Sequence, residues 1–304
     1  MTRYILSRFA QALIGIFFIV TLVFVLVRLT GDPASILVSD FAPIDVQERV
    51  RERLGLDRPY YEQYLTYLGG LIRLDLGESF SGRPVSDIIL QYLPATATLA
   101  LAALSVAVIV AVPLGILSAV YRGTWIDTVA RAVALLGQSI PSFWLAIMLV
   151  LIFGVLLLWL PVAYREGPAS YVLPAVAMGW AAVAGIVRLI RSSMLDVLDS
   201  DYIRMARAKG LPPHVVIVHH ALRSAMIPVL TFTGLLLGSF LNGSVVVESV
   251  FAWPGVGTMT LSAVSGRDFP VVQGAVIMFA VFFITINLMV DILYAFLDPR
   301  IRYR

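Results

Sequence analysis

The sequence predicts an all-α integral membrane protein with six transmembrane helices, and two observations carry that prediction. Of its 304 residues, 60% are hydrophobic and only 13% are charged, whereas soluble proteins have about 45–50% apolar and about 25% charged residues. The apolar residues also fall in separate runs of about twenty, the length of helix that crosses a bilayer. Strands of a membrane barrel would need only about ten residues each, so the longer runs favour helices. The composition excludes a soluble globular domain.

The expected spans follow these apolar runs. The first covers roughly 28 Å as a helix and is longer than the core of a signal peptide, so we take it as a true span. Prolines 113 and 141 are expected to kink their helices and to free carbonyl groups. In order, the six spans are Phe9–Val27, Ala95–Val120, Ala132–Leu160, Tyr171–Ile190, Ile227–Val247 and Val271–Leu297.

The charges divide the chain between the two sides of the membrane. Arginines gather at both termini and in the loops after the second and fourth spans, while acids concentrate between Asp32 and Asp87. Because short cytoplasmic loops are rich in Lys and Arg, both termini are expected in the cytoplasm. The chain then divides into residues 1–29 (N-terminus and first span), an extracytoplasmic segment 30–94, and a core 95–304 with a cytoplasmic loop at 191–226.

The extracytoplasmic segment is expected to be partly helical. Asp45 and Glu48 are spaced as a capping box with Gly55 as the stop, and a second helix is expected from Asp57 and Pro59 to Gly69-Gly70. Its tyrosines suit a membrane interface; they are Tyr60, Tyr61, Tyr64 and Tyr67. The segment is either a small cap without a chemical role or a docking surface for a partner that delivers a substrate.

The cytoplasmic loop between the fourth and fifth spans predicts a helix, a glycine joint and a second helix. Ser200-Asp201 can cap a short helix that Gly210 ends in the left-handed conformation. Pro212 and Pro213 suit the first turn of the next helix, which is expected to stop near Pro228. The loop is amphipathic and basic, so a soluble partner could bind it; a solvated connection that obeys the positive-inside rule explains the charges equally well.

The motifs of this loop resemble the EAA-type coupling loop of ABC importer permeases, in the form found in the dipeptide, oligopeptide and nickel permease family. The general pattern would place glutamate at Arg204 and alanine at Met205, whereas Ala206 and Gly210 agree with it. Nearly the whole chain shares the resemblance. The matching runs are 201–211 (DYIRMARAKGL), 219–223 (HHALR), Ile227-Pro228, Gly31-Asp32-Pro33, 54–57 (LGLD), 75–79 (DLGES), 94–96 (PAT), 139–143 (SIPSF), 248–251 (ESVF), 253–257 (WPGVG) and Asp298-Pro299-Arg300.

The resemblance implies a non-catalytic permease subunit of the type I ABC importer fold, the first (B-type) permease of its system. It implies a second permease subunit, two ATPase subunits that bind ATP and Mg, an extracytoplasmic binding protein, and a place in the inner membrane of a bacterial or archaeal cell. It also implies that the loop helix sits in a groove of an ATPase. The coupling residues would be Tyr202, Arg204, Ala206, Arg207, Lys209 and Gly210. Peptides, nickel, opines and oligosaccharides are the substrates of such systems.

Enzyme motifs are missing from the sequence. There is no cysteine, which excludes disulfides, thiolate metal sites and a cysteine nucleophile. The only lysine, Lys209, precedes Gly210, so no phosphate-binding loop of the form GxxxxGK[ST] exists. The three histidines, His214, His219 and His220, all lie in the cytoplasmic loop. We expect no catalysis, no metal, no cofactor and no nucleic-acid partner for this chain.

Polar residues within spans are candidates for function because burying them in lipid is costly. Candidates for a substrate path are Gln138, Ser139, Asn242, Ser244 and Glu248, although polar residues also mediate helix packing. The Gly- and Pro-rich stretch 251–270 is either a gate-lining loop, with Trp253, Gly255 and Gly257 as its candidates, or a plain connection. Asp291, with Asn287 one turn before it, allows an alternative function: a gradient-driven secondary transporter that uses Asp291 as an ion relay.

Overall fold

The computed structural model describes residues 2–30, 43–53 and 55–297, and these ranges are helical without any extended strand. The matches at Gly31-Asp32-Pro33 and Asp298-Pro299-Arg300 lie outside the described residues. Five helices are long and apolar enough to cross a membrane, and a bent pair makes a sixth candidate span. The predicted all-α membrane class is therefore confirmed. The long helices are α1 (Thr2–Thr30), α5 (Val85–Val120), α8 (Val172–Leu198), α11 (Leu222–Val250) and α13 (Phe269–Leu297).

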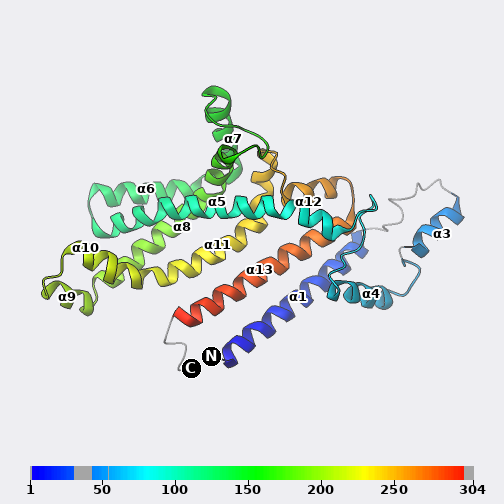
Figure 1. Cartoon of the computed structure of the whole chain (residues 1–304), viewed down its shortest axis with the longest axis horizontal. Helices are drawn as coiled ribbons and strands as arrows, with labels where there is room; N and C mark the ends of the chain where they lie inside the picture. The colour runs from blue at the N-terminus through cyan, green and yellow to red at the C-terminus, as the bar shows by residue number, and fades with distance from the viewer. Residues whose placement is uncertain (1, 31–42, 54, 298–304) are drawn as a thin grey trace.

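Shorter helices connect the long ones. On the segment between α1 and α5 lie α3 (Ile44–Arg53) and α4 (Tyr60–Ile72), and α12 (Val256–Ser265) joins α11 to α13. One end of the bundle, which we call the α9 end, carries α9 and the turn between α5 and α6; the opposite end, the α12 end, carries α4 and α12 (Figure 1). The remaining elements are α6 (Trp125–Ser139), α7 (Ser142–Leu149), the π-helix η1 (Val150–Leu156), the 3-10 helix η2 (Pro168–Tyr171), α9 (Asp201–Ala208), α10 (Pro213–Val215) and the π-helix η3 (Val216–Ala221).

The third expected span, Ala132–Leu160, is wrong as one continuous helix. The chain bends by 101° between α6 and the α7–η1 helix, which projects away from the bundle (Figure 1). Ile140 is extended at the break, with ψ of 119°, because a residue that precedes proline is pushed out of the helical region. Pro141 thus lies at a break between two helices instead of at a kink within one helix.

Small residues let α5 and α8 pack closely at the centre of the bundle. Ala103, Ala107 and Ala111 are fully buried at four-residue spacing. A Cβ on Gly179 would lie 2.6 Å from the carbonyl oxygen of Ala103, and a Cβ on Gly115 would lie 2.7 Å from Ile190. Close backbone approach is the usual source of helix association in lipid, where no hydrophobic force drives helices together. The α5–α8 pair is therefore the rigid centre of the fold.

Helices α1 and α13 lie side by side along one flank of the bundle (Figure 1). Val20, Val23 and Ile277 form their shared core. Toward the chain termini, Arg8 forms an ion pair with Asp291 at 3.4 Å. This pairing places Asp291 in a contact between two helices of the same chain.

Three local expectations differ from the structure. The second outer helix, α4, runs through Gly69-Gly70 to Ile72, and its Tyr64 and Tyr67 pack against Phe24 of α1 while Tyr60 and Tyr61 are exposed. The first outer helix begins at Ile44, so Asp45 lies inside its first turn and binds Arg49. Helix α11 continues through Pro228, because packing of its flanks on α8 and α13 outweighs the loss of one hydrogen bond.

Candidate functional site

Helix α9 forms the tip of the α9 end. Ser200 precedes it in extended conformation, with φ of −74° and ψ of 154°, as helix N-cap residues do. Gly210 follows it with φ of +77°, a conformation that glycine adopts without a Cβ penalty. The helix and its glycine stop, predicted from the sequence, are confirmed. The expected side-chain cap is not, because the Ser200 hydroxyl donates to the carbonyl oxygen of Val197 instead of accepting from an N–H of α9.

Two faces of α9 have opposite roles. Ile203 and Ala206 are buried and belong to the main hydrophobic core with Val216 and Ala221 of η3. The opposite face is solvent-exposed and mostly cationic, with one aromatic ring and one thioether; it comprises Tyr202, Arg204, Met205, Arg207 and Lys209. We expected Ala206 to admit close approach of a partner, but its small side chain faces the chain's own core. The hydroxyl of Tyr202 donates to Ser224 Oγ at 3.1 Å, so this ring is also held against α11.

A buried ion pair anchors the helix that leads into α9. The carboxylate of Asp127 accepts two hydrogen bonds from Arg191 of α8, at 2.8 and 3.0 Å. Ser118 Oγ and the backbone N–H of Gly123 also donate to it, at 2.7 and 3.1 Å. The side chain of Asp127 is only 2% exposed. From the sequence, both residues fall in the loops between spans. The only sequence signal for the pair is that Asp127 is a single acid between Arg122 and Arg131.

A second buried acid, Glu248, organises the loop at the α12 end. Its Oε1 accepts a hydrogen bond from Thr96 Oγ1 at 2.7 Å, and its Oε2 accepts one from the backbone N–H of Thr258 at 3.1 Å. A Cβ on Gly255 would lie 2.3 Å from Oε1 of Glu248. Glu248 is fully buried, so in this conformation it is out of reach of a solute and fixes the loop that follows it.

The three gate-loop candidates pack around this acid. Trp253 is buried, and its Nε1–H donates to the carbonyl oxygen of Ala95 at 3.0 Å. A Cβ on Gly257 would lie 2.6 Å from Val245 Cα. Gly255 and Gly257 thus allow α12 to begin directly against α11. The stretch 251–270 contains the ten-residue helix α12 and packs against α11 where α12 begins.

The remaining candidates for a substrate path lie in different surroundings. Ser244 is fully buried and its hydroxyl bonds to the carbonyl oxygen of Leu241 on its own helix, whereas Asn242 is exposed. Gln138 and Ser139 are exposed at the end of α6. Gln138 Oε1 accepts a hydrogen bond from Arg188 at 2.8 Å. The structure therefore brings Gln138 together with an arginine near the end of the fourth expected span.

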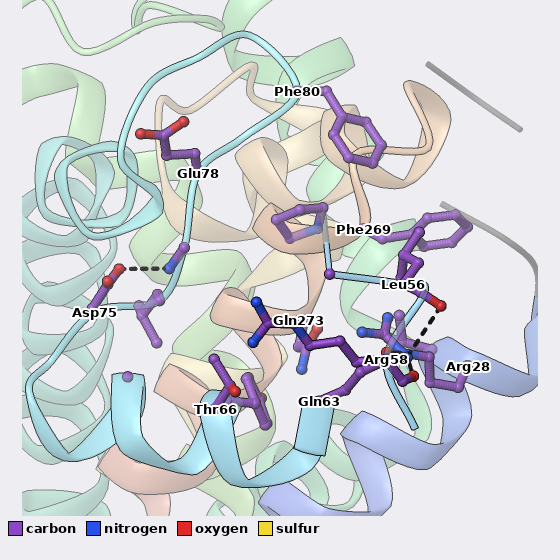
Figure 2. Close-up of a pocket in the computed structure, with 17 residues that line it drawn as sticks. Arg28, Leu56, Arg58, Gln63, Thr66, Asp75, Glu78, Phe80, Phe269 and Gln273 are labelled. Atoms are coloured by element: carbon purple, nitrogen blue, oxygen red, sulfur yellow. Dashed lines mark hydrogen bonds between the residues drawn. The ribbon is translucent and has the colours of Figure 1, made fainter. Parts of the chain in front are cut away.

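A pocket of about 350 Å³ lies at the α12 end, between the end of α1, α4, the loop after α4 and the start of α13 (Figure 2). Arg28 Nε donates to Gln63 Oε1 at 2.9 Å, and Gln63 Nε2 donates to the carbonyl oxygen of Arg58 at 2.8 Å. Burial raises the pKa of Tyr67 to about 12, so this lining phenol stays neutral. The hydrogen bonds across the pocket tie the outer segment to α1.

In the ranges that the structure describes, no three His, Asp or Glu side chains are grouped so that they could hold an ion. His214 and His219 are exposed near α9. Asp291, the basis of the alternative function, is engaged by Arg8. The ion pairs Asp127–Arg191 and Arg8–Asp291 hold helices of this chain together.

Comparison with known proteins identifies the family of the chain. Residues 111–303 match the model of the binding-protein-dependent transport system inner membrane component, and residues 1–100 match the N-terminal model of such membrane components. A putative peptide transport system permease protein of Brucella abortus (strain 2308) is 42% identical over 313 residues, with 100% of both chains covered. The glutathione transport system permease protein GsiC of Escherichia coli (strain K12) is 41% identical over 306 residues, also with 100% of both chains covered.

Solved structures share the fold at low sequence identity. A subunit of the inward-facing MetNI methionine ABC transporter aligns with a TM-score of 0.56 and 16% identity, covering 69% of this chain and 96% of that one. A subunit of an amino acid ABC transporter aligns with a TM-score of 0.52 and 16% identity, covering 71% of this chain and 94% of that one. The chain belongs to the family of binding-protein-dependent transport system inner membrane components and is the non-catalytic permease subunit of an ABC importer.

Proposed function

We propose that this permease forms half of the translocation path for peptides or related small solutes and that α9 receives the movement of an ATPase subunit. The names of the relatives, a putative peptide permease and a glutathione permease, support the substrate class. The observation that carries the coupling role is the two-faced geometry of α9. Ile203 and Ala206 fasten the helix to the core, while Arg204, Arg207 and Lys209 are exposed to a partner.

Connections behind α9 explain how a push on it would reach the spans. Helix α8 ends at Leu198, immediately before Ser200 and α9. The Asp127–Arg191 pair locks α8 to α6, and Ser118 extends the same network to α5. Because packed cores shift between discrete arrangements more readily than they deform, displacement of α9 would move α8 with its neighbours as a unit.

The proposed complex has four subunits in the membrane and beneath it, and one outside. A second, homologous permease subunit would complete the path, two ATPase subunits would bind ATP and Mg, and an extracytoplasmic binding protein would deliver the solute. Positive charge at the α9 end supports a cytoplasmic position for that end and for both termini. The proposed location is the cell membrane of a bacterium, as in the named relatives, or of an archaeon.

Reconstitution of the complete complex in lipid vesicles tests this proposal. We expect uptake of a radiolabelled dipeptide when ATP, the ATPases and the binding protein are all present, and none when ATP is replaced by a non-hydrolysable analogue. In a parallel experiment, a proton gradient replaces ATP as the source of energy. Uptake driven by the gradient without ATP or ATPases would overturn the proposal and restore the role of Asp291 as an ion relay.

A further inference from the structure

The exposed side of helix α8 is polar, although the helix is a candidate span. Its exposed positions recur on one face and include Arg188, Ser192 and Asp196, whereas Ile186 and Ile190 on the other face are buried. Arg188 lies about 15 Å along the helix axis from Leu198. An exposed arginine at such depth is costly in lipid, so it faces protein or a water-filled cavity.

Helix α6 presents a matching polar side to the same place. Arg131 and Gln138 lie on the side that faces α8, while Val129 and Leu136 are exposed on the apolar side of α6. Between the two polar sides is an open groove of about 500 Å³. The groove is lined by Arg131, Ala134, Leu135, Gln138, Val187, Arg188, Arg191, Ser192, Leu195 and Asp196. The groove also contains Ala134, Leu135, Val187 and Leu195. Its arginines, Arg131, Arg188 and Arg191, are what make it a costly place for lipid.

The charges in the groove are unequally matched. Asp127 is already engaged by Arg191 at 2.8 Å and by Arg131 at 3.3 Å. Arg188 donates from one nitrogen to Gln138 Oε1 at 2.8 Å and, within the described ranges, forms no ion pair. A guanidinium carries five N–H donors in a planar fork. One neutral acceptor therefore orients the fork and leaves its charge and most of its donors for an anion.

We propose that the α6–α8 groove is a water-filled wall of the translocation path and that Arg188, oriented by Gln138, binds the carboxylate of the passing solute. The planar fork matches the two oxygens of a carboxylate, the group that peptides carry at their C-terminus. This inference rests on the proposed import of peptides. The other explanation, an acid of the second permease subunit paired with Arg188, is an outcome of the test.

Because the chain has no cysteine, a single introduced thiol reports on the groove. In the complete complex in nanodiscs, Ser192→Cys is treated with anionic sulfonatoethyl and cationic trimethylammonioethyl methanethiosulfonates, and labelling of this chain is read by mass. Val129→Cys, on the apolar side of α6, is the matched control. We expect Ser192→Cys to react and Val129→Cys to remain unlabelled. We expect the anionic reagent to be favoured by about fivefold, and Arg188→Gln to remove that preference.

Protection by a dipeptide tests the carboxylate directly and needs neither ATP nor the binding protein. We expect alanyl-alanine to slow labelling of Ser192→Cys several-fold more than alanyl-alaninamide does. Arg188→Gln should make the two protect equally. Arg188→Lys should keep the anion preference and lose part of the protection, because it keeps the charge without the fork. Arg122→Gln, an exposed arginine outside the groove, is the charge control and should change neither result.

Four results would overturn the inference. If Ser192→Cys is as unreactive as Val129→Cys, the groove is not filled with water. If Arg188→Gln leaves the preference for the anionic reagent unchanged, the charge of Arg188 does not act in the groove. Equal protection by the acid and the amide in the wild-type background would exclude carboxylate binding. Dissociation of the permease pair in Arg188→Gln would assign Arg188 to the subunit contact. Failure of ATP-driven uptake with a reactive, carboxylate-protected groove would count against the proposed function alone.

Discussion

The two ends of this permease use buried acids in the same way, and one end adds an exposed cationic face. At the α12 end, Glu248 is fully buried and holds the loop before α12; at the α9 end, Asp127 is buried and holds α8. Only the α9 end adds a helix whose exposed face carries Arg204, Arg207 and Lys209. The comparison separates the charges that fix the fold from those that are available to a partner.

Removing the buried acid at the α9 end should have the largest effect. Asp127→Ala leaves the partly buried guanidinium of Arg191 without its two hydrogen bonds, and loss of one partner of a buried ion pair typically costs about 3–5 kcal/mol. We expect a large fall in the denaturation midpoint of the purified complex. The matched control is Asp201→Ala, because Asp201 pairs with Arg204 while 98% exposed. Equal midpoints for the two variants would contradict an anchoring role for Asp127.

Removing the buried acid at the α12 end should come next. Glu248→Ala leaves both the N–H of Thr258 and the hydroxyl hydrogen of Thr96 without an acceptor, for a loss of about 2–4 kcal/mol. Glu248→Gln keeps one acceptor oxygen and should cost about half as much. Denaturation midpoints measure both. A normal midpoint in Glu248→Ala together with a raised KM for uptake would instead place this residue on the substrate path.

Sequence reasoning accounts for much of the fold because its signals are local. Five of the six expected spans are single helices in the structure, and α9 lies between Ser200 and Gly210 as predicted, although the Ser200 side chain does not cap it. The length of an apolar run and the residues that start or stop a helix can both be read from one continuous stretch of sequence, without knowing which other elements pack against it. The break at Ile140-Pro141 was visible as a proline, but its 101° angle depends on packing of α7 that no local pattern encodes.

The contents of the site were less predictable because they depend on distant partners. Asp127 and Arg191 are 64 positions apart, and Thr96 and Glu248 are 152 apart. A single sequence gives no measure of such proximity, so neither the burial of Glu248 nor the contact between Arg188 and Gln138 was predicted. Ala206 was assigned to the partner surface because the motif that it matches does not indicate which face of the helix a residue occupies. In the structure Ala206 lies on the face that packs against the core.

The glycine after α9 should affect coupling more than stability. Gly210 has φ of +77°, and a Cβ there would meet nothing within 4 Å, so Gly210→Val costs only the backbone term of about 1–2 kcal/mol. We expect the ratio of dipeptide imported to ATP hydrolysed to fall, since a β-branched residue disfavours the left-handed backbone conformation that sets the direction of the chain after α9. Gly210→Asn tolerates this φ and should be nearly normal. An unchanged ratio in Gly210→Val would remove the joint from the coupling path.

The exposed cations of α9 should have the smallest effect on stability and a clear effect on assembly. Replacing Arg204, Arg207 and Lys209 together by glutamine removes only exposed charges, and such changes usually stay within about 0.5 kcal/mol per site. If these cations meet acids of an ATPase, association should weaken and lose much of its dependence on salt, because screening acts on exposed charge pairs. Pull-down of the ATPases across a salt series measures this, with Arg122→Gln as the charge control outside α9. Unchanged association at low salt would mean that the apolar and aromatic groups of α9, Met205 and Tyr202, carry the contact, and that its positive charge serves only to orient the loop in the membrane.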